Sequence, residues 1–164
     1  CDVESSLIPA ITWARHGRTL NTFADPNIQI LSNGGEIHLR HVRPNDGGTF
    51  TCIAVNSAGQ DMLTYSITVL VPPVIDRSKV KTRHMGIVGQ SLRLNCNATG
   101  SPDPILEWKK GNTLITNDHP HYVLHGGGRS IEVVSLSEED NGVIICSAIN
   151  TAGQDNLNYT LDVM

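Results

Sequence analysis

The 164-residue chain lacks any apolar run that approaches the roughly 20 residues of a membrane-spanning helix. It also lacks an excess of basic residues. Residues 1–71 carry four Arg and no Lys against six acidic residues, and residues 72–164 carry eight basic against ten acidic residues. The formal charge of −4 is mild and evenly spread, so we expect neither a membrane span in this stretch nor a nucleic-acid partner.

Catalytic signatures are absent as well. The Ser, His and Asp residues form no nucleophile elbow, and the sequence shows no phosphate-binding glycine loop and no metalloprotease helix. Gly126-Gly127-Gly128 precedes a predicted strand and not a helix, so we interpret it as a hairpin turn and not as a phosphate site. We therefore expect no enzyme activity, no catalytic residue and no cofactor.

The chain does contain one pattern twice: a cysteine, a tryptophan twelve residues later, and a second cysteine about fifty residues after the first. The two copies are Cys1, Trp13 and Cys52, then Cys96, Trp108 and Cys146. Four cysteines allow three pairings. The repeat favours one disulfide within each copy, with the indole packed against it, which is typical of a two-sheet β-sandwich. Paired cysteines in turn favour an oxidising compartment.

Apolar residues alternate with a period of two on both sides of the second cysteine of each copy. Matched pairs include Ile37 with Ile131, Val42 with Leu136 and Tyr65 with Tyr159. No helical period persists for ten residues. Pro72 and Pro73 cannot donate to a β-ladder, so we expect them to mark the boundary. The sequence predicts an all-β chain with one domain in residues 1–71 and another in residues 72–164.

With these motifs, both units resemble immunoglobulin domains of the intermediate set. Besides the Cys…Trp…Cys spacing, the resemblance rests on Asp-x-Gly-x-Φ-x-Cys at residues 46–52 and 140–146 and on Asn-x-Ala-Gly turns. It covers essentially the whole chain and implies two tandem immunoglobulin-like β-sandwiches, with disulfides between the four cysteines and two core tryptophans. The Val-Pro-Pro-x-Ile linker and the Asn-x-Ala-Gly-Gln-Asp turns look most like the tandem arrays of hemicentin-type matrix proteins.

The chain departs from the family pattern in two places. The family usually has Tyr two residues before the second cysteine, with its hydroxyl bonded to upstream backbone. Phe50 and Ile144 occupy these positions, so we expect less rigid corners. The second unit has about 22 residues ahead of Cys96, whereas the first begins on Cys1. We therefore expect the first β-sandwich to lack its N-terminal strands and the chain to be a piece of a longer array.

Two glycosylation acceptor patterns occur, Asn97-Ala-Thr99 and Asn158-Tyr-Thr160. Asn97 follows an inward cysteine and Asn158 precedes an inward tyrosine, so both asparagines should face solvent. The sequence predicts them as glycosylation candidates in a secreted protein.

Four cations at a spacing of two form a basic stripe: Arg77, Lys79, Lys81 and Arg83. If the segment is extended, they share one face. A sulfated glycan or an acidic partner is the functional interpretation. The structural interpretation, which we favour, is charge that blocks lateral pairing of an edge strand.

His119, His121 and His125 supply imidazoles at short spacing. A zinc site needs four convergent donors, and the cysteines are already assigned to disulfides. We interpret the histidines as an exposed loop cluster and expect no metal site.

The resemblance implies an extracellular adhesion or structural module, in a secreted matrix protein or a cell-surface ectodomain, that binds other proteins homophilically or heterophilically. Fold alone does not give function, and three alternatives stay open. In the first alternative, the chain belongs to the ectodomain of a guidance or growth-factor receptor. In the second, it belongs to an intracellular muscle filament protein with reduced cysteines, and in the third it is a non-catalytic part of a matrix enzyme.

Overall fold

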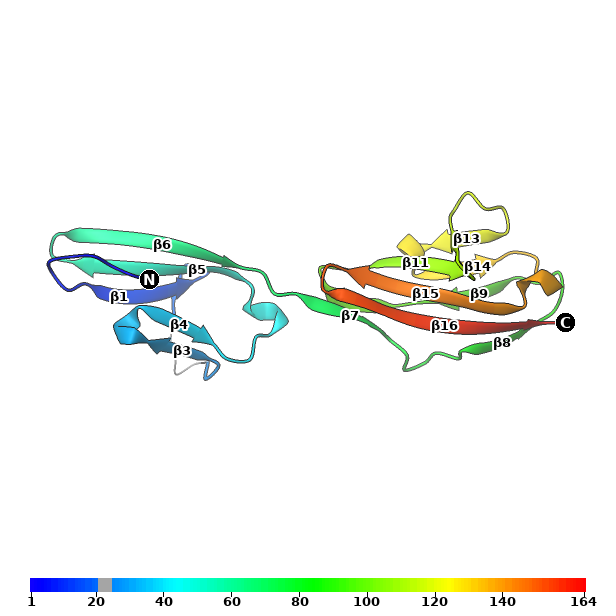
Figure 1. Ribbon diagram of the computed structural model, residues 1–164, viewed down its shortest axis with the longest axis horizontal. Helices are drawn as coiled ribbons and strands as arrows, with labels where there is room; N and C mark the ends of the chain where they lie inside the picture. Colours follow the sequence, from blue (N-terminus) through cyan, green and yellow to red (C-terminus); the bar gives the residue numbers. More distant parts are fainter. Residues whose placement is uncertain (21–24) are drawn as a thin grey trace. The chain divides into compact units, whose positions relative to one another are not determined.

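The computed structural model describes residues 1–20 and 25–164, and its long regular elements are all β-strands (Figure 1). The predicted all-β class is confirmed. Short 3₁₀ turns interrupt the strands: η1 (Ser32–Gly34), η2 (Pro44–Asp46), η3 (Gly126–Gly128) and η4 (Glu138–Asp140). The chain divides into two compact units, Cys1–Val69 and Leu70–Met164, which we call unit 1 and unit 2.

Unit 1 consists of two antiparallel sheets. The larger sheet has the strand order β2-β1-β5-β6, with β1 (Ala10–Arg15), β2 (Arg18–Thr19), β5 (Gly48–Asn56) and β6 (Gly59–Ile67). The smaller sheet pairs β3 (Ile28–Leu31) with β4 (Glu36–Leu39) and lies opposite one face of the larger sheet (Figure 1). Residues 1–9 form no strand, so unit 1 is a β-sandwich without N-terminal strands, as expected.

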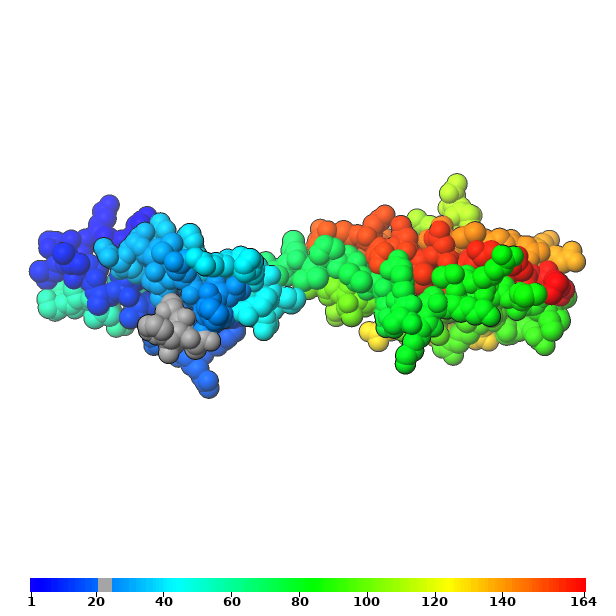
Figure 2. Space-filling model, turned by 90° about the horizontal axis from the view of Figure 1, so that it is seen from below, coloured from blue at the N-terminus to red at the C-terminus, as the bar shows by residue number. Residues whose placement is uncertain are grey.

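Unit 2 is a fuller β-sandwich. Its five-stranded sheet has the order β12-β11-β15-β16-β8, with β8 (Arg83–Gly86), β11 (Ile105–Lys110), β12 (Thr113–Ile115), β15 (Gly142–Asn150) and β16 (Gly153–Val163). A second sheet joins β13 (Tyr122–His125), β14 (Ser130–Val133) and β9 (Leu92–Asn95). A two-stranded sheet pairs β7 (Val71–Ile75) with β10 (Ala98–Ser101). Strand β8 runs parallel to β16, and Figure 2 shows the green segment against the red one.

A disulfide and a tryptophan lie at the centre of each unit. The disulfides are Cys1–Cys52 and Cys96–Cys146, with Cα–Cα distances of 6.3 and 6.5 Å. Trp13 and Trp108 are buried, and each is the cross-strand partner of the second cysteine of its unit. Each indole N–H donates a 2.7 Å hydrogen bond to a glycine carbonyl at the end of a 3₁₀ turn, Gly34 in unit 1 and Gly128 in unit 2. The indole thereby ties the two sheets together without leaving its polar atom unsatisfied.

The two hydrophobic cores differ in size. The buried cluster of unit 2 contains sixteen residues, whereas that of unit 1 contains Trp13, Phe50 and Cys52. Leu157 and Tyr159 of β16 are 4% and 2% exposed, but the matching Leu63 and Tyr65 of β6 are 52% and 40% exposed. In unit 2 the hydroxyl of Tyr159 donates to the carbonyl of Asn95 on β9, a strand of the opposite sheet. Among the described residues of unit 1, the opposite sheet consists of β3 and β4, and no strand corresponds to β9.

The predicted inward pattern is wrong at Val42 of unit 1. Val42 is 56% exposed, whereas the matching Leu136 is 2% exposed. The backbone of Leu136 exchanges hydrogen bonds with Gly89 and Gln90, in the segment that leads into β9. The described part of unit 1 has no such segment, so Val42 has nothing to pack against.

The two Asn-x-Ala-Gly turns close the β5–β6 and β15–β16 hairpins. Asn56 accepts a 2.8 Å bond from the N–H of Ala58, and Asn150 accepts a 2.9 Å bond from that of Ala152. This local side-chain bond fixes the turn in both units.

Candidate interaction surfaces

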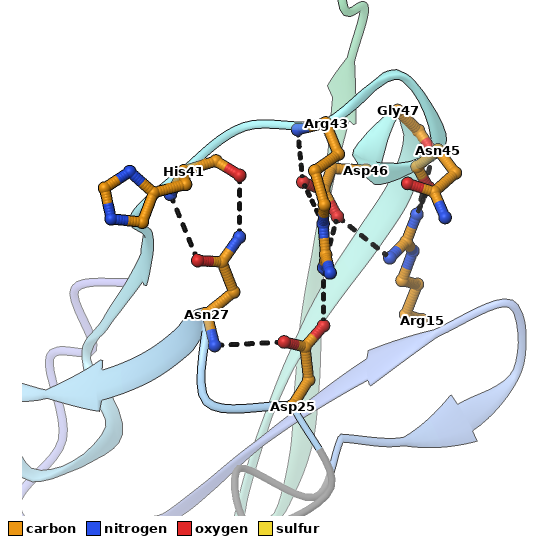
Figure 3. A network of polar contacts seen from close by, with 8 residues as sticks. All are labelled: Arg15, Asp25, Asn27, His41, Arg43, Asn45, Asp46 and Gly47. Atoms are coloured by element: carbon orange, nitrogen blue, oxygen red, sulfur yellow. Dashed lines mark hydrogen bonds and ion pairs between the residues drawn. The ribbon is translucent and has the colours of Figure 1, made fainter.

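A buried carboxylate holds the turn that precedes β5 in unit 1 (Figure 3). Asp46 is 2% exposed and accepts a 2.6 Å bond from the backbone N–H of Arg43. The guanidinium of Arg43 contacts the same carboxylate at 3.1 Å, and that of Arg15 lies 4.0 Å away. The hydrogen bonds from the side chain and backbone of Arg43 hold the pKa of Asp46 below its ordinary value. Asp46 is therefore an ionised anchor for this corner.

The network around Asp46 extends to neighbouring turns. Arg43 Nη2 also donates to Asp25 at 2.7 Å, and Asp25 accepts a 2.9 Å bond from the N–H of Asn27. The side chain of Asn27 donates to the carbonyl of His41 at 2.6 Å and accepts a 3.2 Å bond from its N–H. Figure 3 shows the side chains of Asp25 and Asn27 directed toward the segment of His41 and Arg43, with the imidazole of His41 pointing away from the network. The corner lacks the tyrosine bond of the family, but charged and amide side chains hold it instead.

Unit 2 builds the same corner from different side chains. Asp140, also 2% exposed, accepts a 2.8 Å bond from the N–H of Ser137 and a 2.7 Å bond from the imidazole Nε2 of His121. Lys110 Nζ lies 3.9 Å away. Burial raises the pKa of Asp140, but the bonds from Ser137 and His121 outweigh it and lower the pKa overall. One of the three predicted histidines is therefore a structural partner of a buried carboxylate.

The other two histidines have separate partners. His119 Nδ1 accepts a 3.2 Å bond from the N–H of His121, and His125 Nε2 lies 3.1 Å from Glu132. Within residues 1–20 and 25–164, no group of three or more His, Cys, Asp or Glu side chains is placed to hold a metal ion. Gly126-Gly127-Gly128 forms η3, in the β13–β14 hairpin, and supplies the carbonyl that Trp108 binds.

The basic stripe is not a continuous strand. Residues 76–82 form no strand, and β8 begins at Arg83. Arg77 makes a two-pronged ion pair with Asp155, at 2.8 and 3.0 Å, and Arg83 Nε lies 2.7 Å from Asp162. In the part of the chain that the structure describes, only Lys79 and Lys81 of the four form no ion pair. The condition for a single basic face is not met, and an acidic or sulfated partner stays a prediction. Arg83 does lie on an edge strand, where a charge hinders lateral pairing.

Both glycosylation candidates are exposed. Asn97 lies between β9 and β10, and Asn158 lies on β16. Their neighbours Cys96 and Tyr159 are buried, so the side chains of the two asparagines point away from the core.

Among the described residues, the outer face of the larger sheet of unit 1 carries no charged residue. Cross-strand partners share a face of a sheet, and three rows cross the strands here. They are Thr19, Ala14, Thr51 and Thr64, then Thr12, Ile53 and Met62, then Ala10, Val55 and Gln60. We call these ten residues the outer face of unit 1.

The matching face of unit 2 is different in character. Its rows contain Glu107 and Lys109 on β11, and the sequon residue Asn158 occupies the place of Thr64. A glycan on Asn158 would project over this face. The two units therefore present unlike surfaces on equivalent sheets.

The inner face of β6 lines an open groove in unit 1. Its walls include Trp13, Ile37, Phe50, Tyr65 and Ile67. Leu63 lies on the same side of β6 as Tyr65 because side chains of a strand alternate. This groove, and not the outer face, is where the described part of unit 1 lacks a strand that corresponds to β9, to which Tyr159 bonds in unit 2.

Sequence reasoning missed the partners of the two buried aspartates. The repeated Asp-x-Gly motif was the one sequence signal that pointed to Asp46 and Asp140 themselves. It did not indicate Arg15 and Arg43 in one unit or His121 in the other, because these side chains approach from different strands and loops.

Comparison with known proteins places these features in a family. The family model of the immunoglobulin I-set domain matches residues 1–69 and 77–163. Mouse hemicentin-1 is 32% identical over 165 residues, covering 99% of this chain and 3% of that protein. Rat neural cell adhesion molecule 1 is 29% identical over 168 residues, covering 99% of this chain and 20% of that protein. The chain thus spans only a small part of these relatives.

The solved structure of an I-band fragment from titin is 26% identical, with a TM-score of 0.67, and the match covers 94% of this chain and 55% of that one. None of the described residues belongs to a helix long and apolar enough to cross a membrane. With two disulfide-and-tryptophan cores and two matches to the family model, the chain belongs to the immunoglobulin I-set family and contains two tandem domains of it.

Proposed function

We propose that the chain is a non-catalytic, protein-binding module of an extracellular multi-domain protein, with an adhesive or structural role. The observation that carries this proposal is the pairing of all four cysteines in two disulfides beside buried tryptophans. Disulfides form and persist in oxidising environments and are rare in the cytosol. For a loop of about fifty residues, each adds on the order of 4 kcal/mol in the chain-entropy model.

The comparisons support the adhesive part of the proposal. One relative is named for cell adhesion, and the hemicentin resemblance implies a matrix protein. The exposed sheet faces and end loops offer surface for partners. Separately, the described residues contain no group of His, Cys, Asp or Glu side chains placed to hold a metal ion. Two exposed sequons support secretion, because glycans are added to Asn-x-Ser/Thr sites of secreted proteins.

A second candidate is an intracellular filament module, which the likeness to titin favours. The two candidates differ in chemistry. A cytosolic module keeps its thiols reduced and carries no N-linked glycan, whereas the extracellular module contains two disulfides and glycan on Asn97 or Asn158.

Peptide mass spectrometry of native material under non-reducing conditions tests the proposal. We expect the peptide pairs that contain Cys1–Cys52 and Cys96–Cys146, and a deglycosylation mass change at Asn97 or Asn158. Asn97→Gln and Asn158→Gln variants are the matched controls for assigning the glycan. Four free thiols and two unmodified asparagines in native material would contradict the extracellular proposal and support the filament alternative.

A further inference from the structure

We infer that Asn33 is a site of spontaneous modification, at which the side-chain amide is lost and the main chain is rebuilt through the side-chain carbonyl. This modification is independent of the proposed function. Asparagine loses its amide most easily before glycine, because glycine has no side chain to obstruct ring closure. The pair occurs twice in the chain, at Asn33-Gly34 and at Asn141-Gly142. The structure distinguishes these two pairs.

The reaction consumes only water. The backbone nitrogen of Gly34 attacks Cγ of Asn33, so that a new C–N bond closes a five-membered succinimide ring. The bond from Cγ to Nδ2 breaks, and the amide group leaves as ammonia with the proton of the glycine N–H. Water then opens the ring at one of its two carbonyls. The product is either aspartate or isoaspartate, in which the main chain runs through Cβ and Cγ.

Asn33 lies in an exposed turn that leaves its side chain free to react. It is the middle residue of η1, between β3 and β4, with φ and ψ of +52° and +36°. Within the part of the chain that the structure describes, its side chain forms no hydrogen bond. The attack requires rotation about the Cα–C bond, which disrupts the 3.0 Å turn bond from the N–H of Gly35 to the carbonyl of Ser32. Local opening of a short exposed turn costs little free energy.

Asn141 is held in place, although it is also exposed. Its Oδ1 accepts a 2.6 Å bond from the N–H of Val163, and its Nδ2 lies 3.4 Å from the carbonyl oxygen of the same residue. The next residue, Gly142, belongs to β15 and pairs with Leu161 of β16. The reaction at Asn141 therefore waits until the side-chain bonds and this end of the ladder have opened, which is a rarer event.

The turn of unit 1 requires glycine after Asn33 but does not require the asparagine. Gly34 has a φ of +93°, and a Cβ there would lie 3.1 Å from Cβ of Ile11 and 3.2 Å from its carbonyl oxygen. The residue of unit 2 that matches Asn33 is Gly127, with φ and ψ of +69° and +29°. Glycine therefore fits the place of Asn33, and the turn of unit 1 differs by combining a required glycine with a reactive amide.

The modification acts on the core of unit 1. The carbonyl of Gly34 accepts the 2.7 Å bond from the indole N–H of Trp13. Isoaspartate lengthens the main chain immediately before Gly34 by one C–C bond, about 1.5 Å. A shift of that size at the carbonyl is enough to break the hydrogen bond. We therefore expect the isoaspartate form to lose the contact that ties Trp13 to its turn.

The test is to incubate the whole chain at neutral pH and physiological temperature and to map its peptides by mass spectrometry. We expect the mass change from Asn to Asp to appear at Asn33 at least about tenfold faster than at Asn141, because the second reaction waits for local opening. Labelling by an isoaspartate-specific methyltransferase identifies the isoaspartate product. In concentrated urea, where neither site is protected by structure, the two rates should agree within about threefold.

Two variants at one position separate the causes. Asn33→Gly introduces the residue that unit 2 has and should abolish the modification of unit 1. Asn33→Asp adds the charge without lengthening the main chain, so exchange of the Trp13 indole N–H should stay within about twofold of the unaltered chain. In the isoaspartate form the same proton should exchange at least about tenfold faster, while that of Trp108 stays unchanged.

Conversion of Asn141 in the folded chain as fast as that of Asn33 would overturn the inference. So would an Asn33 that stays intact in the folded chain over the time in which both sites convert in urea. Unchanged exchange of the Trp13 indole N–H in the isoaspartate form would disprove the effect on the core. None of these results bears on the disulfides and glycans of native material, on which the proposed function depends.

Discussion

The imidazole Nε2 of His121 lies 2.7 Å from the buried carboxylate of Asp140, whereas arginines contact the matching Asp46. A guanidinium offers five donors in a planar fork, whereas an imidazole offers a single ring N–H toward one oxygen. Two corners with equivalent buried aspartates therefore depend on different partners. The corner of unit 1 is held by two arginines, and that of unit 2 by a hydrogen bond from one imidazole.

Replacing His121 should destabilise unit 2 alone. In His121→Ala the buried Asp140 keeps its bond from the N–H of Ser137 but loses the imidazole, and we expect unit 2 to lose about 1–3 kcal/mol of unfolding free energy. Amide exchange of β15 and β16 measures the loss. His119→Ala is the control, because His119 makes no contact with the carboxylate, and should cost less than about 0.5 kcal/mol. Equal losses in the two variants would show that His121 does not support the corner.

The ion pair of Arg77 and Asp155 should make unit 2 sensitive to acid. The hydrogen bonds from Arg77 are the largest cause that lowers the pKa of Asp155 from 3.8 to about 2. Because the folded pKa lies below the unfolded one, the unfolded chain binds more protons between these values. The contribution to stability is therefore complete above about pH 4 and is lost as the pH falls toward 2.

Urea titrations of unit 2 at pH 5, 4, 3 and 2, followed by its amide signals, test this dependence. Asp155→Asn should lower stability at pH 5 and flatten the fall below pH 4. Asp61→Asn is the matched control in unit 1. Within the described residues its side chain bonds only to the N–H of Met62, and we expect no change in either unit. A fall of the same steepness in Asp155→Asn would contradict the assignment.

The fold could be predicted because its main signals are local or repeated. The cysteines, the tryptophans and the apolar period of two can each be read from a short stretch of sequence. The second copy of the pattern provides an internal check on the first. Val42 shows the limit of that method. Its sequence match with Leu136 is real, but burial depends on whether another segment lies against it. Among the described residues, only unit 2 has such a segment, at Gly89 and Gln90.

The candidate site was predictable only in part. The exposure of Asn97 and Asn158 could be predicted, because each lies next to a buried residue and the alternation of side chains along a strand is a local property. The ion pairs of Arg77 with Asp155 and of Arg83 with Asp162 could not be predicted, because these partners lie about eighty residues away in the chain. Which face of a sheet lacks charge likewise depends on the register of three strands, and no single segment of the sequence displays it.

Gly128 should tolerate alanine less well than its neighbour. A Cβ at Gly128 would lie 2.9 Å from the carbonyl oxygen of Leu106, whereas a Cβ at Gly127 would meet nothing within 4 Å. Both glycines have positive φ, +92° and +69°, so each alanine carries about 1–2 kcal/mol of backbone strain. We expect Gly128→Ala to lower the free energy of unfolding by at least about 1 kcal/mol more than Gly127→Ala does, since the clash moves the carbonyl that Trp108 binds. Exchange of the Trp108 indole N–H measures the difference, and equal rates would refute it.

Unit 1 should open before unit 2. Sixteen buried residues form the core cluster of unit 2, and three of the described residues form that of unit 1, while Leu63 and Tyr65 remain half exposed. Because a fully buried apolar side chain contributes about 1.5–3 kcal/mol, we expect amides of β5 to exchange at least about a hundredfold faster than those of β15. The two indole N–H groups give a matched pair, since Trp13 and Trp108 donate to equivalent carbonyls at the same 2.7 Å. Equal protection of the two strands and the two indoles would show that the disulfide Cys1–Cys52 and the charged corner of Asp46 offset the smaller core.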